Sequence, residues 1–472
     1  MTRLTILHTN DLHARVTQLV RIAALAKTLR HEVEAAGGHC VLWDAGDAED
    51  TTLVESSMTK GNAVMAMLRG AGYELEALGN ASPLRYGPQC IAALAEQFGR
   101  PLLCANFIDP HTRQLVAGLS PYAILNFGDL KVGVIGLTDP LSAYRIFKLI
   151  TPAPVDILPG LIEEVRGRGA QTIILLSHLG SPKDRAVAET VSGIDLIVGA
   201  HDHQEIYPPL NVNGTLIVQA GYFGRHLGRL DLEIDSTTGR IVQHRGELLP
   251  ITDEMPIDAE AQAAVETERE RVQQITAHVI GHAHQPIEVA YDRECVAGQL
   301  LADALRDRMQ VDIALALSGQ WTTPLEAGPI TIGNLFAACR STANPGVVSL
   351  SGQQIVDFLQ AAIQPENSAH TPRGQRGVPI GWPNVAGLRV SYDPAAHQII
   401  EVYAGDARLE PDRLYRVAST DMELTDYTGY LRLSDDQIEY EVPTISAEVL
   451  QDYIEARGSI GAGDQRFFRR DG

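Results

Sequence analysis

Side chains that bind metal ions follow a series of short apolar segments in the first 203 residues of the chain. Residues 4–7 lead into Asp11 and His13, and residues 173–176 lead into His178. Apolar runs of this length are typical of buried strands, so we expect the polar groups to gather at one edge of a sheet. The candidate ligands are Asp11, His13, Asp47, Asn80, His178, His201 and His203. This set predicts a site for two divalent cations in a fold where a strand precedes nearly every ligand.

The length of 472 residues exceeds what one hydrophobic core usually supports, which predicts at least two domains. The formal net charge of −21 argues against a nucleic-acid polymer as partner, because such binding depends on Lys and Arg neutralising phosphates. A small phosphorylated substrate is compatible with this charge, since bound cations dominate the field around them. The sequence leaves the oligomeric state open.

The cysteines and the N-terminus bear on location. The five cysteines are scattered and form no C-x-x-C pair, and unpaired thiols fit a reducing compartment. No stretch approaches the ~20 apolar residues of a membrane span, so no membrane partner is expected. Residues 1–3 lead into the first strand without a signal peptide, which predicts a cytoplasmic protein. A chain whose leader had been removed would instead be periplasmic or extracellular.

Strand-like and helix-like segments alternate over residues 1–250, which predicts a layered α/β domain. We expect strands at 4–7, 40–43, 132–137, 172–176, 196–198, 216–220 and 228–234, and helices at 16–36, 61–70, 90–98 and 158–168. Residues 251–278 include a Gly-free, polar stretch with good helix-forming composition, and predict a solvated linker helix. Residues 279–472 form a second domain, with helices at 295–309, 332–338 and 353–363 and a hairpin at 387–403.

Mixed carboxylate and imidazole ligands suit Mn²⁺, Zn²⁺ and Fe²⁺. Two such ions ~3.5–4 Å apart hold the attacking and leaving oxygens of an in-line displacement and generate hydroxide near neutral pH. Asp47 is the natural carboxylate to bridge them, and Asn80 is the second residue expected to take part directly. The ligand set therefore predicts hydrolysis of a phosphoric ester by a metal-bound hydroxide.

Five segments carry a family resemblance. They are residues 9–13 (Thr-Asn-Asp-Leu-His), 44–47 (Asp-Ala-Gly-Asp), 78–80 (Leu-Gly-Asn), 176–178 (Leu-Ser-His) and 199–203 (Gly-Ala-His-Asp-His). Together they resemble the motifs of calcineurin-like metallophosphoesterases, and more closely those of the 5′-nucleotidase and 2′,3′-cyclic-nucleotide phosphodiesterase branch. The resemblance is strong over residues 1–235 and weaker beyond.

The resemblance implies a four-layer αββα catalytic domain followed by an α+β domain of 5′-nucleotidase type that recognises substrate. It also implies two divalent ions, Mn²⁺, Zn²⁺ or Fe²⁺. The first would be held by Asp11, His13, Asp47 and His203. The second would be held by Asp47, Asn80, His178 and His201.

The sequence departs from the family beside the asparagine ligand. The family has a histidine there and an aspartate shortly after, whereas this chain has Ala81 and, near the aspartate position, Leu84. Loss of such a positioned proton donor typically costs roughly 10²–10⁴-fold in rate, mostly for poor leaving groups. Arg85 is a candidate phosphoryl contact, and the alternative for it is a solvated loop arginine.

The second domain departs as well. The substrate-contacting arginine of the family's Asn-Gly-Gly-x-Ile-Arg segment corresponds to Thr322. Arg340 is a candidate replacement for that anion contact. Trp321 and Tyr430 are candidate substrate contacts in place of the family's stacking aromatics, and the alternative for both is a core or rim aromatic.

Three hypotheses remain from the sequence. The first is an active metal-dependent phosphoric ester hydrolase, a divergent phosphodiesterase or phosphatase, acting on a small and nucleotide-like or other phosphorylated substrate. The second is a conventional 5′-nucleotidase with substitute residues. The third is a metal-retaining pseudoenzyme that binds a phosphorylated ligand without turnover. Retention of all seven ligands favours an enzyme, and loss of the histidine and arginine favours the first hypothesis over the second.

Overall fold

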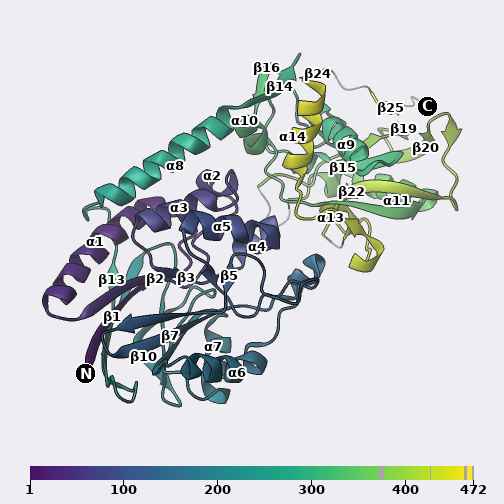
Figure 1. Cartoon of the computed structure of the whole chain (residues 1–472). Helices are drawn as coiled ribbons and strands as arrows, with labels where there is room; N and C mark the ends of the chain where they lie inside the picture. The colour runs from purple at the N-terminus through teal and green to yellow at the C-terminus, as the bar shows by residue number, and fades with distance from the viewer. Residues whose placement is uncertain (372–376, 426, 462–464, 470–472) are drawn as a thin grey trace. The chain divides into compact units, whose positions relative to one another are not determined.

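The computed structural model describes residues 1–371, 377–425, 427–461 and 465–469 (Figure 1). The chain folds into two compact units, Met1–Gln273 and Gln274–Gly472, which are considered separately below. None of the helices among the described residues is long and apolar enough to span a membrane.

Two sheets form the centre of the first unit. The first has the order β13-β12-β1-β2-β3, with β1 (Thr2–Thr9), β2 (His39–Asp44), β3 (Leu75–Glu76), β12 (His226–Ile234) and β13 (Ile241–Pro250). The second has the order β10-β11-β9-β8-β7-β6, with β6 (Tyr122–Phe127), β7 (Leu130–Thr138), β8 (Thr172–His178), β9 (Leu196–Val198), β10 (Glu205–Val212) and β11 (Thr215–Ala220). Strands β6, β10 and β13 lack a clean alternating pattern and were not among the predicted strands.

The two sheets pack face to face. Leu4 and Ile6 of β1 and Ile174 and Leu176 of β8 belong to the core between them. The alternate residue Leu7 points to the opposite face, as the two-residue period of a strand requires. Burial on both faces explains why these strands are continuous apolar runs, each buried Leu or Ile contributing ~1.5–3 kcal/mol.

Helices cover both outer faces of this pair of sheets (Figure 1). The helices α1 (Val16–Ala35), α3 (Asn62–Gly70) and α5 (Ile91–Phe98) pack on the first sheet. The helices α6 (Pro154–Gly167) and α7 (Ser181–Thr190) pack on the second. The four-layer αββα prediction is therefore confirmed.

The predicted linker helix differs in extent and in packing. Helix α8 spans Ala259–Ala277, and the Asp258 carboxylate caps it by accepting from the backbone N–H groups of Glu260 and Ala261, at 3.1 and 3.0 Å. Ala261, Val265 and Val272 lie on one face at helical spacing and belong to the same hydrophobic cluster as residues of α1 and α3. Only the outer face of α8 is solvated, because this apolar stripe packs against the first unit.

The second unit is a mixed α+β structure, as predicted. Its five-stranded sheet has the order β18-β15-β22-β17-β23, with β15 (Ile313–Leu317), β17 (Pro345–Ser351), β18 (Pro383–Ala386), β22 (Leu414–Thr420) and β23 (Glu439–Tyr440). The predicted hairpin is β19 (Leu388–Asp393) paired antiparallel with β20 (Gln398–Ala404). The main helices are α9 (Val296–Met309), α10 (Ile332–Ala338), α11 (Gly352–Ala362) and α14 (Ser446–Arg457).

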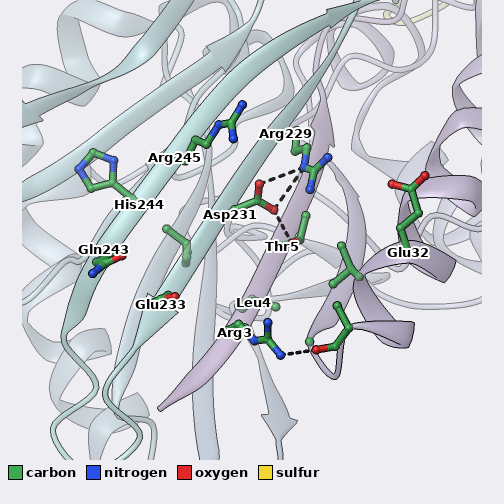
Figure 2. Close-up of a pocket in the computed structure, with 14 residues that line it drawn as sticks. Arg3, Leu4, Thr5, Glu32, Arg229, Asp231, Glu233, Gln243, His244 and Arg245 are labelled. Carbon is green, nitrogen blue, oxygen red and sulfur yellow. Dashed lines mark hydrogen bonds and ion pairs between the residues drawn. The ribbon is translucent and has the colours of Figure 1, made fainter.

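A cavity of about 350 Å³ opens beside β1, β12, β13 and the end of α1 (Figure 2). Residues of both charges line it. Arg229 pairs with Asp231 at 3.0 Å, and the Thr5 hydroxyl donates a hydrogen bond to Asp231 at 2.6 Å. Thr5 of the cavity lining is separated from Thr9, the last residue of β1, by ~13 Å of extended strand. The candidate ligands Asp11 and His13 come after Thr9. This cavity is therefore at the opposite end of the sheet from the predicted metal ligands.

Candidate metal centre

The predicted ligands collect at the carboxyl ends of parallel strands in both sheets. Asp11 and His13 follow β1, Asp47 follows its parallel neighbour β2, and His178 is the last residue of β8. His201 and His203 follow β9, which is parallel to β8. Parallel pairing brings these strand ends to a common edge of each sheet. The two sheets together thus supply all of the histidine and aspartate ligands that the sequence predicts.

The first group consists of Asp11, His13 and His203. Asp11 Oδ1 lies 3.4 Å from His203 Nε2 and 3.9 Å from His13 Nε2, and the two Nε2 atoms are 3.3 Å apart. Oδ1 is buried and accepts no hydrogen bond from the described residues, whereas Oδ2 accepts from the side chain of Asn10 and from the backbone of His201. A buried carboxylate oxygen left without a donor between two imidazole nitrogens fits a divalent cation.

The second group consists of Asp47, Asn80 and His178. His178 Nε2 lies 3.3 Å from Asp47 Oδ2 and 3.2 Å from Asn80 Oδ1. The other ring nitrogen, Nδ1, is 3.0 Å from the carbonyl oxygen of Ala45. When Nδ1 carries the proton and donates it to that carbonyl, the Nε2 lone pair faces the two oxygens, which is the tautomer a metal ligand needs.

Asp47 connects the two groups. Ligand atoms of Asp11, Asp47 and His178 all lie within 4.8 Å of one another. Burial raises the pKa of Asp47, but the charge and hydrogen bond of His178 outweigh burial and lower the pKa to about 2. Burial likewise lowers the pKa of His178, and the Asp47 carboxylate raises it to about 10. Asp47 is therefore an ionised carboxylate that lies between the two candidate ligand groups.

His201 is held by a residue pair that the sequence analysis missed. Its Nε2 atom lies 3.5 Å from Asp139 Oδ2, and the buried Asp139 carboxylate also receives the Lys183 ammonium at 2.5 and 2.6 Å. A carboxylate facing Nε2 leaves Nδ1 of His201 to bind a cation. Asp139 follows the apolar strand β7, so the rule that identified the ligands also applies to it. Lys183 on α7 carries no comparable sequence signal.

Several ligands adopt backbone conformations that non-glycine residues rarely occupy. Positive φ angles occur at Asp11 (50°), His13 (47°), Asp47 (55°), His201 (80°) and His203 (59°). Each costs of order 1–3 kcal/mol and persists only where the surroundings hold it. Here the backbone N–H of Asp11 donates to the carbonyl of Gly46, and that of His13 donates to the carbonyl of Asp47, at 2.9 and 3.0 Å. The loops are therefore fixed to one another before any cation binds.

Two motif glycines make room for the ligands. A Cβ atom at Gly79 would lie 2.0 Å from Asp47 Oδ1 and 2.3 Å from the Asp47 backbone nitrogen. A Cβ atom at Gly46, where φ is +105°, would lie 2.6 Å from His178 Nδ1. Both positions thus require glycine for close approach.

The segment after Asn80 is a helix and not the loop that we expected. Helix α4 spans Ala81–Tyr86, and the backbone N–H of Ala81 donates to Asp47 Oδ1 at 2.8 Å. Arg85 lies in its last turn, with the guanidinium 4.8 Å from the centre of the Tyr86 ring. The prediction that Arg85 contacts a phosphoryl group stays a prediction.

The candidate contacts of the second unit have different surroundings. Trp321 is 0% exposed and packs in the core, so its predicted role as a substrate contact is wrong for this structure. The Thr322 hydroxyl donates to the carbonyl of Ala338 at 3.0 Å. Tyr430 is half-buried with its ring edge-on to Phe358 at 5.7 Å, and Arg340 is exposed. Tyr430 and Arg340 therefore stay candidates.

Known proteins resemble both parts of the chain. A family model described as the C-terminal domain of 5′-nucleotidase matches residues 279–433. An uncharacterized metallophosphoesterase of Bacillus subtilis, YunD, is 27% identical, and the match covers 89% of this chain and 92% of YunD. A 5′-nucleotidase of Bos taurus is 26% identical, with 96% of this chain and 88% of that protein covered.

Solved structures share the fold over the full length. A 5′-nucleotidase precursor from Thermus thermophilus has a TM-score of 0.54 at 24% identity, with 100% of each chain covered. An NAD nucleotidase from Haemophilus influenzae has a TM-score of 0.60 at 16% identity, again with 100% of each chain covered. With the metal-ligand geometry above, these findings show that residues 279–433 match the C-terminal domain of 5′-nucleotidase and that the chain as a whole is similar to metallophosphoesterases and 5′-nucleotidases.

Proposed function

We propose that the chain is a dinuclear phosphodiesterase or phosphatase that acts on esters with good leaving groups in preference to nucleoside 5′-monophosphates. The substrate class is a small, nucleotide-like or otherwise phosphorylated molecule. The cations are Mn²⁺, Zn²⁺ or Fe²⁺, because these ions accept mixed carboxylate, amide and imidazole ligands. The proposal is supported by the convergence of the ligand groups and by the absence of a proton donor in the side chain at position 81.

The ligand sets are those that the family resemblance implies, and the two groups at the strand ends support them. Asp11, His13, Asp47 and His203 would hold one cation, and Asp47, Asn80, His178 and His201 would hold the other. When bound, two such cations neutralise phosphoryl charge and make a water nucleophilic near neutral pH. The protein residues fix this arrangement: Ala45 sets the His178 tautomer, and Asp139 orients His201.

The proposed substrate preference depends on Ala81. Its methyl side chain cannot protonate a departing oxygen, while its backbone N–H still donates to Asp47. A nucleoside alkoxide departs poorly without a proton, whereas p-nitrophenolate departs without one. Removal of a general acid at this position should therefore spare activated esters and penalise AMP.

A conventional 5′-nucleotidase is the second candidate, because a relative of that name is 26% identical across nearly the whole chain. That candidate requires another residue to do the work of the missing histidine. Arg85 is the cation nearest in sequence to position 81. The two candidates differ in the substrate that they favour.

One comparison of substrates tests the proposal. Protein loaded with Mn²⁺ is assayed with bis-p-nitrophenyl phosphate, p-nitrophenyl phosphate and AMP. We expect turnover of the activated esters to exceed AMP turnover by at least ~10²-fold, the usual contribution of a general acid. Efficient AMP hydrolysis would favour the conventional nucleotidase, and no turnover with two metals bound would favour a pseudoenzyme.

Two variants control for the integrity of the site. Asp47→Asn removes the shared carboxylate and should abolish all hydrolysis. Asp129→Asn makes the same chemical change at an exposed turn between β6 and β7 and should leave hydrolysis unchanged. A similar loss of hydrolysis in both variants would indicate that the substitutions unfold the protein, and not that Asp47 is needed for the reaction.

A further inference from the structure

The catalytic unit carries an aromatic and cationic cluster against its first ligand group. The cluster consists of Tyr222, Phe223, Arg15 and Arg225. The Tyr222 ring stacks on the His203 ring with centroids 4.8 Å apart and planes at 15°. The Phe223 ring meets the His13 ring edge-on at 5.6 Å, and the backbone N–H of Phe223 donates to the carbonyl of Asp11 at 2.8 Å. The two aromatic residues are thus fixed directly against the metal ligands.

An arginine guanidinium lies over each of the two aromatic rings. Arg15 lies over the Phe223 ring at 4.1 Å, and Arg225 lies over the Tyr222 ring at 4.2 Å. Arg225 also donates to the Tyr222 hydroxyl at 2.7 Å, and Arg15 donates to the carbonyl of His13 at 3.0 Å. The two rings touch at a centroid distance of 4.8 Å, so both guanidiniums border one aromatic pair.

Neither arginine is neutralised. Within the described parts of the chain, no carboxylate lies within 4.0 Å of the Arg15 or Arg225 guanidinium. The Glu205 carboxylate, on the strand beside this loop, pairs instead with His226 at 3.4 Å. Two uncompensated cations on one aromatic pair contrast with a net charge of −21. Such a pair attracts an anion, since each guanidinium keeps N–H donors beyond those already used.

The stacking geometry favours an anion over a nucleobase. The His203 imidazole stacks on the Tyr222 ring and the Arg225 guanidinium lies over it, so the ring already has two stacking partners. The free groups of the cluster are guanidinium N–H edges, which match phosphate oxygens. Position 322, where the family resemblance implies a substrate-contacting arginine, is a threonine.

We propose that Arg15 and Arg225 form a second anion subsite, which binds a phosphate group joined to the one that reacts. The preferred substrates would then be phosphoanhydrides, in which a second phosphate extends from the scissile one toward this cluster. This inference rests on the proposed function, because it assigns the part of the substrate that lies beside the metal centre. It also places substrate recognition within the catalytic unit.

Calorimetry with a diphosphate that cannot be hydrolysed tests the subsite. Mn²⁺-loaded full-length protein is titrated with methylenediphosphonate and, separately, with phosphate. We expect the diphosphonate to bind at least tenfold more tightly, and we expect Arg225→Gln to reduce that preference roughly tenfold, the equivalent of one charge-assisted hydrogen bond. The double variant Arg15→Gln/Arg225→Gln should abolish it.

Arg168→Gln is the matched control. Arg168 also lies over a tyrosine ring, that of Tyr122 at 5.4 Å, but it pairs with Glu164 on the outer helix α6. This variant should keep the full preference for diphosphonate. An equal affinity for both probes in the unmodified protein, or an unchanged preference in the double variant, would overturn the proposal. Because the probe is not hydrolysed, the result stands apart from whether the protein turns over any ester.

Discussion

Gly79→Ala should disable metal binding although it adds only a methyl group. The new Cβ would lie 2.0 Å from Asp47 Oδ1, 2.3 Å from the Asp47 nitrogen and 2.8 Å from the Asp47 Cα. Ordinary contact begins near 3.4 Å, so Asp47 would have to retreat by more than 1 Å. Two of the three clashing atoms are backbone, which a change of rotamer cannot relieve.

The cost has two parts. Forcing a methyl group into a packed site typically costs ~1–3 kcal/mol. Displacing Asp47 also weakens its hydrogen bond from the Ala81 N–H, and hydrogen bonds to charged groups contribute ~1.5–3 kcal/mol. The free energy of unfolding should therefore fall by roughly 2.5–6 kcal/mol. Metal ligands tolerate shifts of only about ±0.2 Å, so the affinity for Mn²⁺ should fall by at least ~100-fold.

The measurement combines calorimetric Mn²⁺ titration with thermal unfolding of the metal-free protein. Gly160→Ala is the matched control, because Gly160 lies in helix α6 with nothing within 4 Å of its added Cβ. That change should leave Mn²⁺ affinity unchanged and stabilise the protein by ~0.5–1 kcal/mol, as alanine does in a helix. Two Mn²⁺ ions bound by Gly79→Ala with the original affinity would refute the reasoning.

Three further predictions concern the surroundings of the metal centre. Asp139→Asn should lower the affinity for one of the two Mn²⁺ ions by ~10–100-fold, because the substitution removes the carboxylate that orients His201. Calorimetry would show this as a weaker second binding step. Asp184 has a pKa raised by burial to about 7 from 3.8, so the folded chain binds the extra proton and stability should fall as pH rises from about 4 to 7. Asp184→Asn should reduce this loss of stability with rising pH, measured by denaturant titrations of the metal-free protein at several pH values. The same dependence of unfolding free energy on pH in the variant would contradict the assignment to Asp184. Chelation of Mn²⁺ supplied at 100 times its Kd should lower the unfolding free energy by ~2.7 kcal/mol per site, measured as a drop in Tm.

The sequence was sufficient to predict which polar side chains gather at the strand ends, because strand burial and ligand chemistry are both local signals. Apolar runs buried on two faces mark β1, β2, β8 and β9, and the polar residues at their ends are the predicted ligands. The same rule would have found Asp139 after β7. Lys183 could not be predicted from the sequence, because its partner Asp139 lies 44 positions away on another element.

Contacts that depend on tertiary packing were predicted less well. Trp321 and Tyr430 read alike in sequence, yet only the structure places Trp321 at 0% exposure and Tyr430 partly exposed. The Arg15 guanidinium and the Phe223 ring come from separate loops, whereas Arg225 and Tyr222 lie three positions apart in one loop. In the first pair the partners are 208 positions apart, and no periodic pattern links them.

The backbone explains how the candidate metal centre is held without a histidine at position 81. Asp47 is held by the N–H of Ala81, a bond that any residue except proline at position 81 would preserve. A histidine at this position can therefore be replaced without moving the shared carboxylate. Ligands fixed by backbone hydrogen bonds and close-packed glycines resist change, whereas side chains that contact only substrate do not. Divergence within this fold should thus appear in the substrates accepted before it appears in the metals bound.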